Sequence, residues 1–397
     1  MQTETHSLKE LTILNGLVNL AIFLIYPFLI LEWKNSFGVG INFSILVVFS
    51  ICARIFGALF FPKLEKIFDG KIVTIALVLA AAGAGAYGYS HILSYIIQIV
   101  AVLSIGFAHG IWIANLQNSI NLNSDTATSA TKISSNVQLV ASIGVVIGSL
   151  VSNIAYKSLG FGESALIVAV IFLLLACATG IRSRLLFSAR KRPMPQSQDK
   201  SDIDASLSIV NNFNSTSVIA LVGTILTLIA YSSLNFLAPI SAKEFQSDFP
   251  VGNFFAINAL IVIVAQYAFS QISRLHLWSR AILISQLTLG ISFVILSYFH
   301  SHPLVLYIFV VSLSFAEVAL FPAFSGMFKF LISQKAVKPK SASSLYITAK
   351  IFGLGTGGIL WPKLTLLGNI PAATTGIILV IFSIASSLFV IRQGFKT

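Results

Sequence analysis

Charged residues are scarce in this sequence: they make up 10% of its 397 residues, whereas apolar residues make up 56%. A water-soluble domain carries about 25% charged residues, so the composition excludes a soluble fold. Cysteine is also rare. Cys52 and Cys177 both fall in apolar segments, outside any CxxC pair or metal-ligand spacing. A disulfide framework is therefore excluded.

Motifs that carry enzymatic chemistry are missing as well. The sequence has no Walker A loop, HExxH, GxSxG or dinucleotide fingerprint in a plausible context. This excludes a primary ATP-driven pump unless a partner chain supplies the ATPase. We therefore expect a protein that is not an enzyme, with no catalytic residue, no bound metal and no cofactor.

Long apolar runs dominate what is present. A helix needs about 20 residues to cross a bilayer, and twelve apolar segments of 18 to 26 residues can be marked out. The sequence predicts an all-α, polytopic membrane protein with twelve spans, at 11–31, 41–61, 72–90, 94–116, 133–155, 164–181, 214–239, 251–270, 281–299, 304–328, 342–362 and 370–391.

The net charge of +12 suggests a nucleic-acid partner only until the basic residues are located. With a cytoplasmic N-terminus, 19 lysines and arginines fall in cytoplasmic segments and four in outside loops. Cytoplasmic loops of membrane proteins carry this excess of positive charge. We therefore expect both termini in the cytoplasm, a bacterial inner (plasma) membrane location, a bilayer as partner and no nucleic-acid binding.

The two halves of the chain repeat at a nearly constant offset. Gly106-Phe107-Ala108 matches Ser314-Phe315-Ala316 at an offset of 208, and the segments flanking four spans match at 209. Such a repeat predicts two pseudo-symmetric six-helix bundles of parallel topology. The predicted domains are residues 1–181, a polar and basic cytoplasmic linker at 182–213, and residues 214–397.

These features resemble the major facilitator superfamily over essentially the whole chain. The family's motif between spans 2 and 3 keeps Gly57 and the terminal Gly70-Lys71, without the spaced aspartate. Its span 5 antiporter signature is reduced to Gly144-Val-Val-Ile-Gly148-Ser149 and lacks the proline. The resemblance implies that spans 1, 4, 7 and 10 line a central cavity, that spans 2 and 11 meet at the domain interface, and that the protein works by alternating access.

Four ionisable residues lie inside the predicted spans: Arg54, His109, Glu317 and Lys350. Such groups are expensive in a bilayer and mark functional sites by default. Glu317 is a candidate proton-coupling carboxylate, because a desolvated carboxylic acid titrates nearer neutrality. The alternative is a static salt bridge with Lys350. His109 is a second proton-coupling candidate, although a lone membrane histidine is often only hydrogen-bonded to a neighbouring helix.

Lys350 begins a glycine-rich stretch and is a candidate cation for a substrate carboxylate. Arg54 is expected to act with it, since a guanidinium holds carboxylates bidentately. Arg54 could instead be a helix-end anchor that reaches the headgroups. One acid against two fixed cations favours an anionic or carboxylate-bearing substrate.

Uncharged polar residues form stripes at helical spacing. A membrane helix must turn such a face to water or to another helix, so the stripes predict either cavity lining or interhelical hydrogen bonds. Trp112 could stack on a substrate or could simply pack. The resulting substrate-binding candidates, besides Lys350 and Arg54, are Asn15, Asn19, Tyr26, Trp112, Gln138, Tyr231, Asn235 and Tyr346. Thr131 and Ser134 share the stripe of Gln138, and Ser343 shares that of Tyr346.

The sequence therefore predicts a monomeric secondary transporter that moves a small organic solute, with protons as the coupling ion and uptake slightly favoured. A proton antiporter that exports a carboxylate siderophore, metabolite or drug fits the same basic cavity. A membrane-embedded enzyme acting on lipid-linked substrates is the alternative of another class. It is disfavoured by the dispersed ionisable residues.

Overall fold

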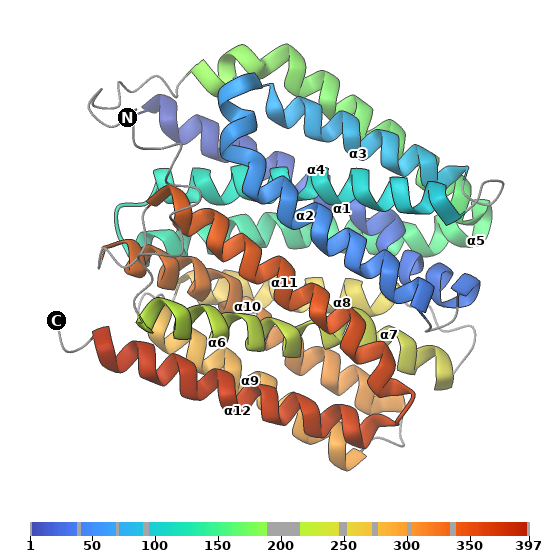
Figure 1. The fold of residues 1–397 in the computed structure, drawn as a ribbon, viewed down its shortest axis with the longest axis vertical. Coiled ribbons are helices and arrows are strands. Elements are labelled where there is room, and N and C mark those ends of the chain that lie inside the picture. The colour runs from blue at the N-terminus through green and yellow to red at the C-terminus, as the bar shows by residue number, and fades with distance from the viewer. Residues whose placement is uncertain are drawn as a thin grey trace.

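The computed structural model describes residues 2–37, 41–68, 71–89, 95–188, 215–245, 252–271, 277–299, 303–333 and 339–394. Within these ranges all regular structure is helical (Figure 1). The helices are α1 (Gln2–Phe37), α2 (Ile41–Phe68), α3 (Ile72–Gly88), α4 (Tyr95–Leu122), α5 (Ala127–Ser188), α6 (Ser215–Tyr231), α7 (Ser233–Phe245), α8 (Gly252–Gln271), α9 (Trp278–Phe299), α10 (Pro303–Ser333), α11 (Pro339–Thr365) and α12 (Asn369–Gly394).

The helices account for the twelve predicted spans. Nine described segments are long and apolar enough to cross a membrane. The segment Ala127–Gly180 holds two crossings, because α5 bends at Gly160, whose φ of 86° suits glycine. One crossing consists of α6 and α7 together, while the shorter apolar helix α3 and the glycine-rich helix α11 supply the remaining two. The prediction of an all-α, twelve-span protein is confirmed.

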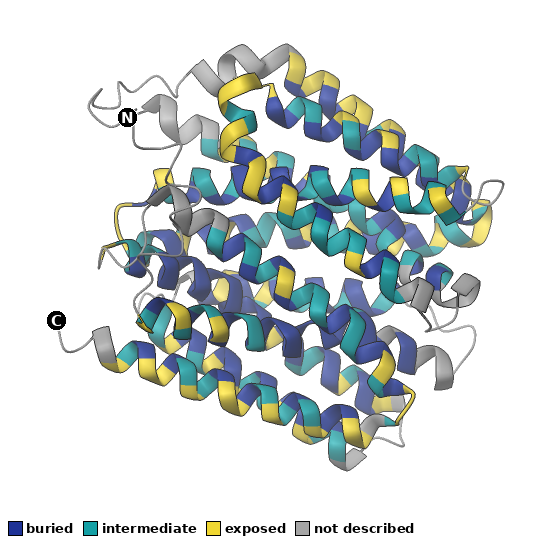
Figure 2. Ribbon diagram, in the orientation of Figure 1, coloured by how far each residue is buried: buried dark blue, intermediate teal, exposed yellow. Residues whose placement is uncertain are grey.

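The outer surface is that of a protein immersed in lipid. Large apolar side chains such as Ile96, Ile154 and Val264 are more than 60% exposed. Figure 2 shows exposed positions along the outer helices of both halves. Soluble proteins rarely expose continuous apolar patches of this kind, so hydrocarbon is the natural solvent of this surface.

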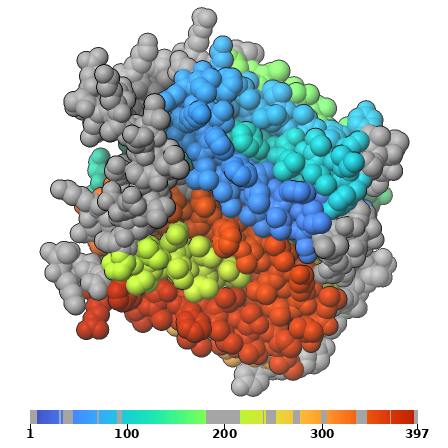
Figure 3. All heavy atoms as spheres, in the orientation of Figure 1, coloured from blue at the N-terminus to red at the C-terminus, as the bar shows by residue number. Residues whose placement is uncertain are grey.

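The helices form two groups that meet along a seam. In the first half, α1 packs on α5, α2 on α4, and α3 on both α4 and α5; in the second half, α6 packs on α11 and α12, and α10 on α8 and α9. Contacts between the halves join α5 to α8 and α10, and α2 to α11. In the space-filling view α2 and α11 meet along this seam (Figure 3). Both termini lie at one end of the molecule, named here the terminal end (Figure 1).

The boundary of the predicted linker is partly described. Residues 182–188 of the predicted linker form the C-terminal end of α5. The rest of the predicted linker, residues 189–213, lies outside the described residues.

Glycine contacts repeat between the halves. A Cβ on Gly144 would collide with the Gly16 carbonyl, and one on Gly148 would lie 2.5 Å from the Leu20 carbonyl oxygen. The positions 209 residues later behave alike: Cβ atoms on Gly353 and Gly357 would lie 2.9 and 3.0 Å from the carbonyl oxygens of Ile225 and Ile229, which stand 209 residues after Gly16 and Leu20. Small residues let membrane helices approach this closely. The sequence repeat is therefore a repeat of helix contacts.

The seventh span is interrupted where a single helix was predicted. α6 ends at Tyr231 and α7 begins at Ser233. The indole of Trp361 donates hydrogen bonds to the Ile229 carbonyl (2.7 Å) and to Ser232 Oγ (3.0 Å). A side chain that satisfies the freed carbonyl lets a buried helix break. The break places Tyr231 at the last position of α6.

Candidate functional site

A buried carboxyl group lies between the halves. Glu317 on α10 is 7% exposed and accepts three hydrogen bonds from neutral donors. Its Oε1 is 2.7 Å from Gln138 Nε2 of α5, and its Oε2 is 2.5 Å from the Tyr231 hydroxyl and 2.9 Å from Asn258 Nδ2. Ser314 Oγ donates to Asn258 Oδ1 at 2.7 Å and orients that amide. The carboxyl group is thus tied to the first half by Gln138 and to the second half by Tyr231 and Asn258.

One face of α10 lies along the seam. Glu317, Phe321 and Ser325 follow at spacings of four, so they lie on one side of the helix. The predicted stripe on span 5 faces them: Gln138 meets Glu317, and Ser134 Oγ is 3.1 Å from Ser325 Oγ. One turn further, the Thr131 side chain lies against Gly326.

Lys350 on α11 contacts an aromatic ring. Its Nζ lies 4.1 Å from the centroid of Phe321. The Phe321 ring meets the Tyr231 ring edge-on at 5.4 Å, and Tyr231 in turn donates to Glu317. The Glu317 hydrogen bonds described above go to neutral groups and do not include Lys350. One turn before Lys350, the Tyr346 ring packs on Phe328 of α10 at 5.2 Å.

The halves also meet at the terminal end. Lys329 Nζ donates to the Asn121 carbonyl at 3.2 Å near the C-terminal end of α4, and Ser325 Oγ is 3.5 Å from Gln117 Oε1. Both pairs are 208 residues apart, so equivalent positions of the repeat touch each other here. A local symmetry axis therefore passes between α4 and α10 at this end.

This contact predicts a specific cross-link. In a variant with Cys52→Ser and Cys177→Ser, adding Ser134→Cys and Ser325→Cys should give a disulfide under mild oxidation, because the two Oγ atoms are 3.1 Å apart. Oxidation should lock the seam and stop transport, and a reductant should restore it. Gel mobility after cleavage between the halves would measure the link.

The matched control for the cross-link is Ser135→Cys with Ser325→Cys in the same background. Ser135 is adjacent in sequence but contacts Gln266 of α8. Equally fast cross-linking of the two pairs would contradict the seam described here.

On the other side of Glu317, different groups join the halves. Asn153 Nδ2 donates to Asn253 Oδ1 at 3.0 Å between α5 and α8. The Phe255 ring of α8 lies 5.7 Å from Phe23 and 6.0 Å from Tyr26 of α1. Polar and aromatic contacts between the halves thus lie on both sides of Glu317.

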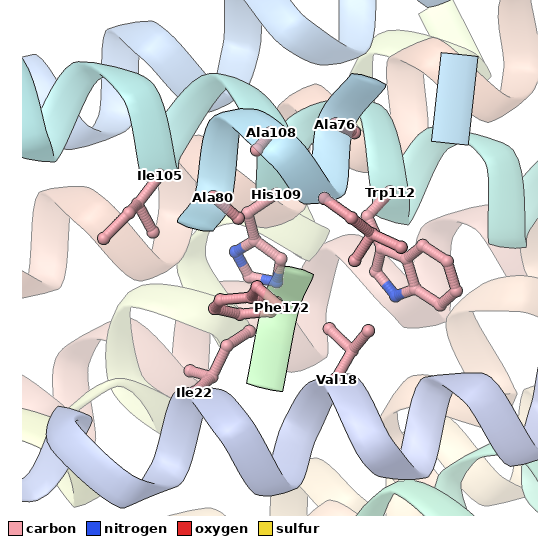
Figure 4. A pocket seen from close by; sticks show the side chains of 10 residues that line it. Val18, Ile22, Ala76, Ala80, Ile105, Ala108, His109, Trp112 and Phe172 are labelled. Atoms are coloured by element: carbon pink, nitrogen blue, oxygen red, sulfur yellow. The ribbon is translucent and has the colours of Figure 1, made fainter. Parts of the chain in front are cut away.

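His109 lies in a different environment. It lines a small pocket with Trp112 of its own helix α4 and with residues of α1, α3 and α5 (Figure 4). Every lining residue belongs to the first half, and small side chains such as Ala76 and Ala80 make the space. Trp112 Nε1 donates to Asn15 Oδ1 at 3.0 Å, and Asn19 Nδ2 donates to the Asn15 carbonyl at 2.8 Å. The structure therefore groups three of the substrate-binding candidates into a network inside the first half.

The remaining candidates lie around these groups. Arg54 on α2 is half-buried, and its buried Nε has no hydrogen-bond partner. Asn235 is half-buried on α7. Of the predicted site residues, Glu317, Gln138 and Tyr231 are brought into direct contact, and Lys350 is linked to them through Phe321.

Two residues of this arrangement were missed from the sequence. Asn258 is one of four amide residues in the apolar helix α8, and Phe321 is one of 32 phenylalanines. Phe321 could have been identified by its place one helical turn after Glu317. Asn258 stands 208 residues after Ser50, whose carbonyl lies close to Gly106, but this contact is visible only in the structure.

Two repeated six-span halves that enclose a carboxyl group are the architecture of a membrane transporter. The chain belongs to the Major Facilitator Superfamily, whose sequence model matches residues 11–328. No curated protein matches the chain by sequence.

Solved structures of transporters share the fold at low identity. The human organic anion transporter MFSD10 (TETRAN) has a TM-score of 0.68 and 16% identity, with 97% of this chain and 99% of that chain covered. The nucleoside transporter NupG (D323A mutant) has a TM-score of 0.67 and 16% identity, with 97% of this chain and 99% of that chain covered. The proton:xylose symporter XylE bound to 6-bromo-6-deoxy-D-glucose has a TM-score of 0.70 and 12% identity, with 98% of this chain and 95% of that chain covered. These likenesses establish the fold.

Proposed function

We propose that the protein is a proton-coupled secondary transporter that takes up a small organic anion, with the terminal end in the cytoplasm. One observation carries the proposal: Glu317 is buried between the halves on neutral donors, while the Lys350 ammonium rests on an aromatic ring. An acid so placed can exchange a proton when one side of the seam opens, and the lysine offers charge to a substrate carboxylate.

The hydrogen bonds around Glu317 suit such a role. As a carboxylate, Glu317 accepts from all three donors. When it is protonated, an amide or hydroxyl partner must rotate to offer an oxygen. Gln138 is the partner on the other half and contacts Oε1, so a proton that binds Oε1 changes a contact between the halves. A ligand shifts a conformational equilibrium only through such a difference between states.

An uptake assay tests this function. Purified protein in liposomes would first be screened by thermal shift against carboxylates, sugars, nucleosides, amino acids and siderophores at two pH values. Uptake of the stabilising compound would then be followed with the outside more acidic than the inside. We expect accumulation that a protonophore abolishes. Accumulation driven by the opposite gradient would instead favour export by proton antiport.

The proposed binding of an anionic substrate by Lys350 can be tested separately. Lys350→Ala should weaken binding of a carboxylate substrate by more than about tenfold, since losing one partner of a buried charge pair costs about 2–5 kcal/mol. Lys329→Ala is the matched control. Lys329 lies on α10 about three turns after Glu317, and its ammonium donates to a carbonyl near the C-terminal end of α4. Titration of the purified protein would measure both. Unchanged affinity in Lys350→Ala would remove Lys350 from the substrate site.

A further inference from the structure

We propose that Phe321 is a positioning residue that determines the anion specificity of the central site, by holding the Lys350 ammonium on its ring and away from Glu317. This inference rests on the proposed function, because it concerns the cation that would bind the substrate. It names a residue for which the sequence pattern alone suggested no role.

Phe321 contacts the lysine and lies one helical turn from the acid. Phe321 follows Glu317 by one turn of α10 and is 7% exposed. Lys350 reaches the same face of α10 from α11, with Nζ 4.1 Å from the ring centroid. Glu317 and Phe321 share this face of α10, so the acid and the lysine both lie beside the same turn of the helix. An acid and a flexible lysine this near would normally pair unless another contact competes.

The competing contact is a cation–π interaction. An ammonium within about 6 Å of an aromatic centroid gains ~0.5–2 kcal/mol, with the larger values at desolvated sites. Phe321 is itself fixed by its edge-on contact with Tyr231. Glu317 meanwhile has its hydrogen bonds supplied by Gln138, Tyr231 and Asn258. The Lys350 ammonium and the Glu317 carboxyl group therefore each have contacts of their own.

This separation has a chemical consequence. A ring contacts only one side of an ammonium, so the N–H donors of Lys350 that point away from Phe321 remain available to an arriving carboxylate. A lysine paired with Glu317 would have to break that pair first. Phe321 therefore favours ligands that bring their own negative charge, and it leaves Glu317 free to exchange a proton.

The first test needs no ligand. Cryo-electron microscopy of wild-type protein, Phe321→Leu and Phe321→Tyr in lipid nanodiscs should show the lysine on the ring in the two aromatic forms. In Phe321→Leu we expect Lys350 Nζ within about 4 Å of a Glu317 carboxyl oxygen, the limit of an ion pair. A Lys350 that stays away from Glu317 in Phe321→Leu would overturn the proposal.

The second test uses succinate and benzoate as probes. Phe321→Leu should bind them about tenfold more weakly than wild type, in line with a desolvated cation–π contact. Adding Glu317→Gln to Phe321→Leu should restore the affinity of the Glu317→Gln single variant, because the competing carboxylate is gone. Equal affinity of wild type and Phe321→Leu, or no recovery in the double variant, would reject the role of Phe321. If the wild-type protein binds neither probe, the result counts against the proposed anionic substrate. The ligand-free structures would then still show whether Phe321 keeps Lys350 away from Glu317.

Discussion

Replacing Glu317 by glutamine is expected to abolish accumulation driven by a proton gradient while substrate exchange across the membrane continues. Glutamine has the size of glutamate and keeps hydrogen-bonding capacity toward Gln138, Tyr231 and Asn258, but it binds no proton at this position. A gradient of two pH units supplies about 2.7 kcal/mol per proton, enough for roughly hundredfold accumulation of a co-transported solute. The Glu317→Gln protein should show none.

The measurement compares gradient-driven uptake with counterflow in the same liposomes. Glu163→Gln is the matched control, since Glu163 is an exposed acid near the bend of α5. It should accumulate substrate as the wild type does. Gradient-driven accumulation by Glu317→Gln would place the coupling group elsewhere, with His109 as the next candidate.

The second large effect concerns stability. Gly144→Ala should lower the apparent melting temperature in detergent by about 2–4 °C, because overpacking a close helix contact costs about 1–3 kcal/mol or more. The new Cβ would collide with the carbonyl of Gly16 on α1. Differential scanning fluorimetry of the purified protein would measure the change.

Gly85→Ala is the matched control within the same half. A Cβ there would meet only the Cβ of Ala169, at an ordinary 3.9 Å. Alanine is the better helix former by about 1 kcal/mol, so this variant should melt at or slightly above the wild-type temperature. A similar loss in both variants would mean that glycine content in general, and not the α1–α5 contact, determines stability.

The spans, the repeat and part of the site could be predicted because they depend on sequence periodicity. The lengths of apolar runs gave the twelve crossings, and helical spacing placed Thr131, Ser134 and Gln138 on one face. The structure turns that face toward α10. The offset of 209 residues holds again in the glycine contacts of Gly144 and Gly353.

What could not be predicted depends on how the helices rotate against each other. Periodicity groups the residues of one face without saying which neighbour that face meets. His109 and Glu317 are equivalent in the repeat, yet one lines a pocket inside the first half and the other lies between the halves. The break after Tyr231 was also invisible, because it depends on Trp361, which is distant in sequence. The contact of Phe321 with Lys350 could not be predicted either, because the lysine reaches the ring from another helix.

The paired glycine contacts limit where the molecule can bend. At these glycines α1 packs against α5, and α6 against α11, so closely that an added Cβ would collide with the neighbouring helix. Each half should therefore move as a rigid body. The conformational change during transport should be a rotation of one half against the other. Spin labels placed within one half should keep a single separation throughout turnover, whereas labels placed across the halves should report two.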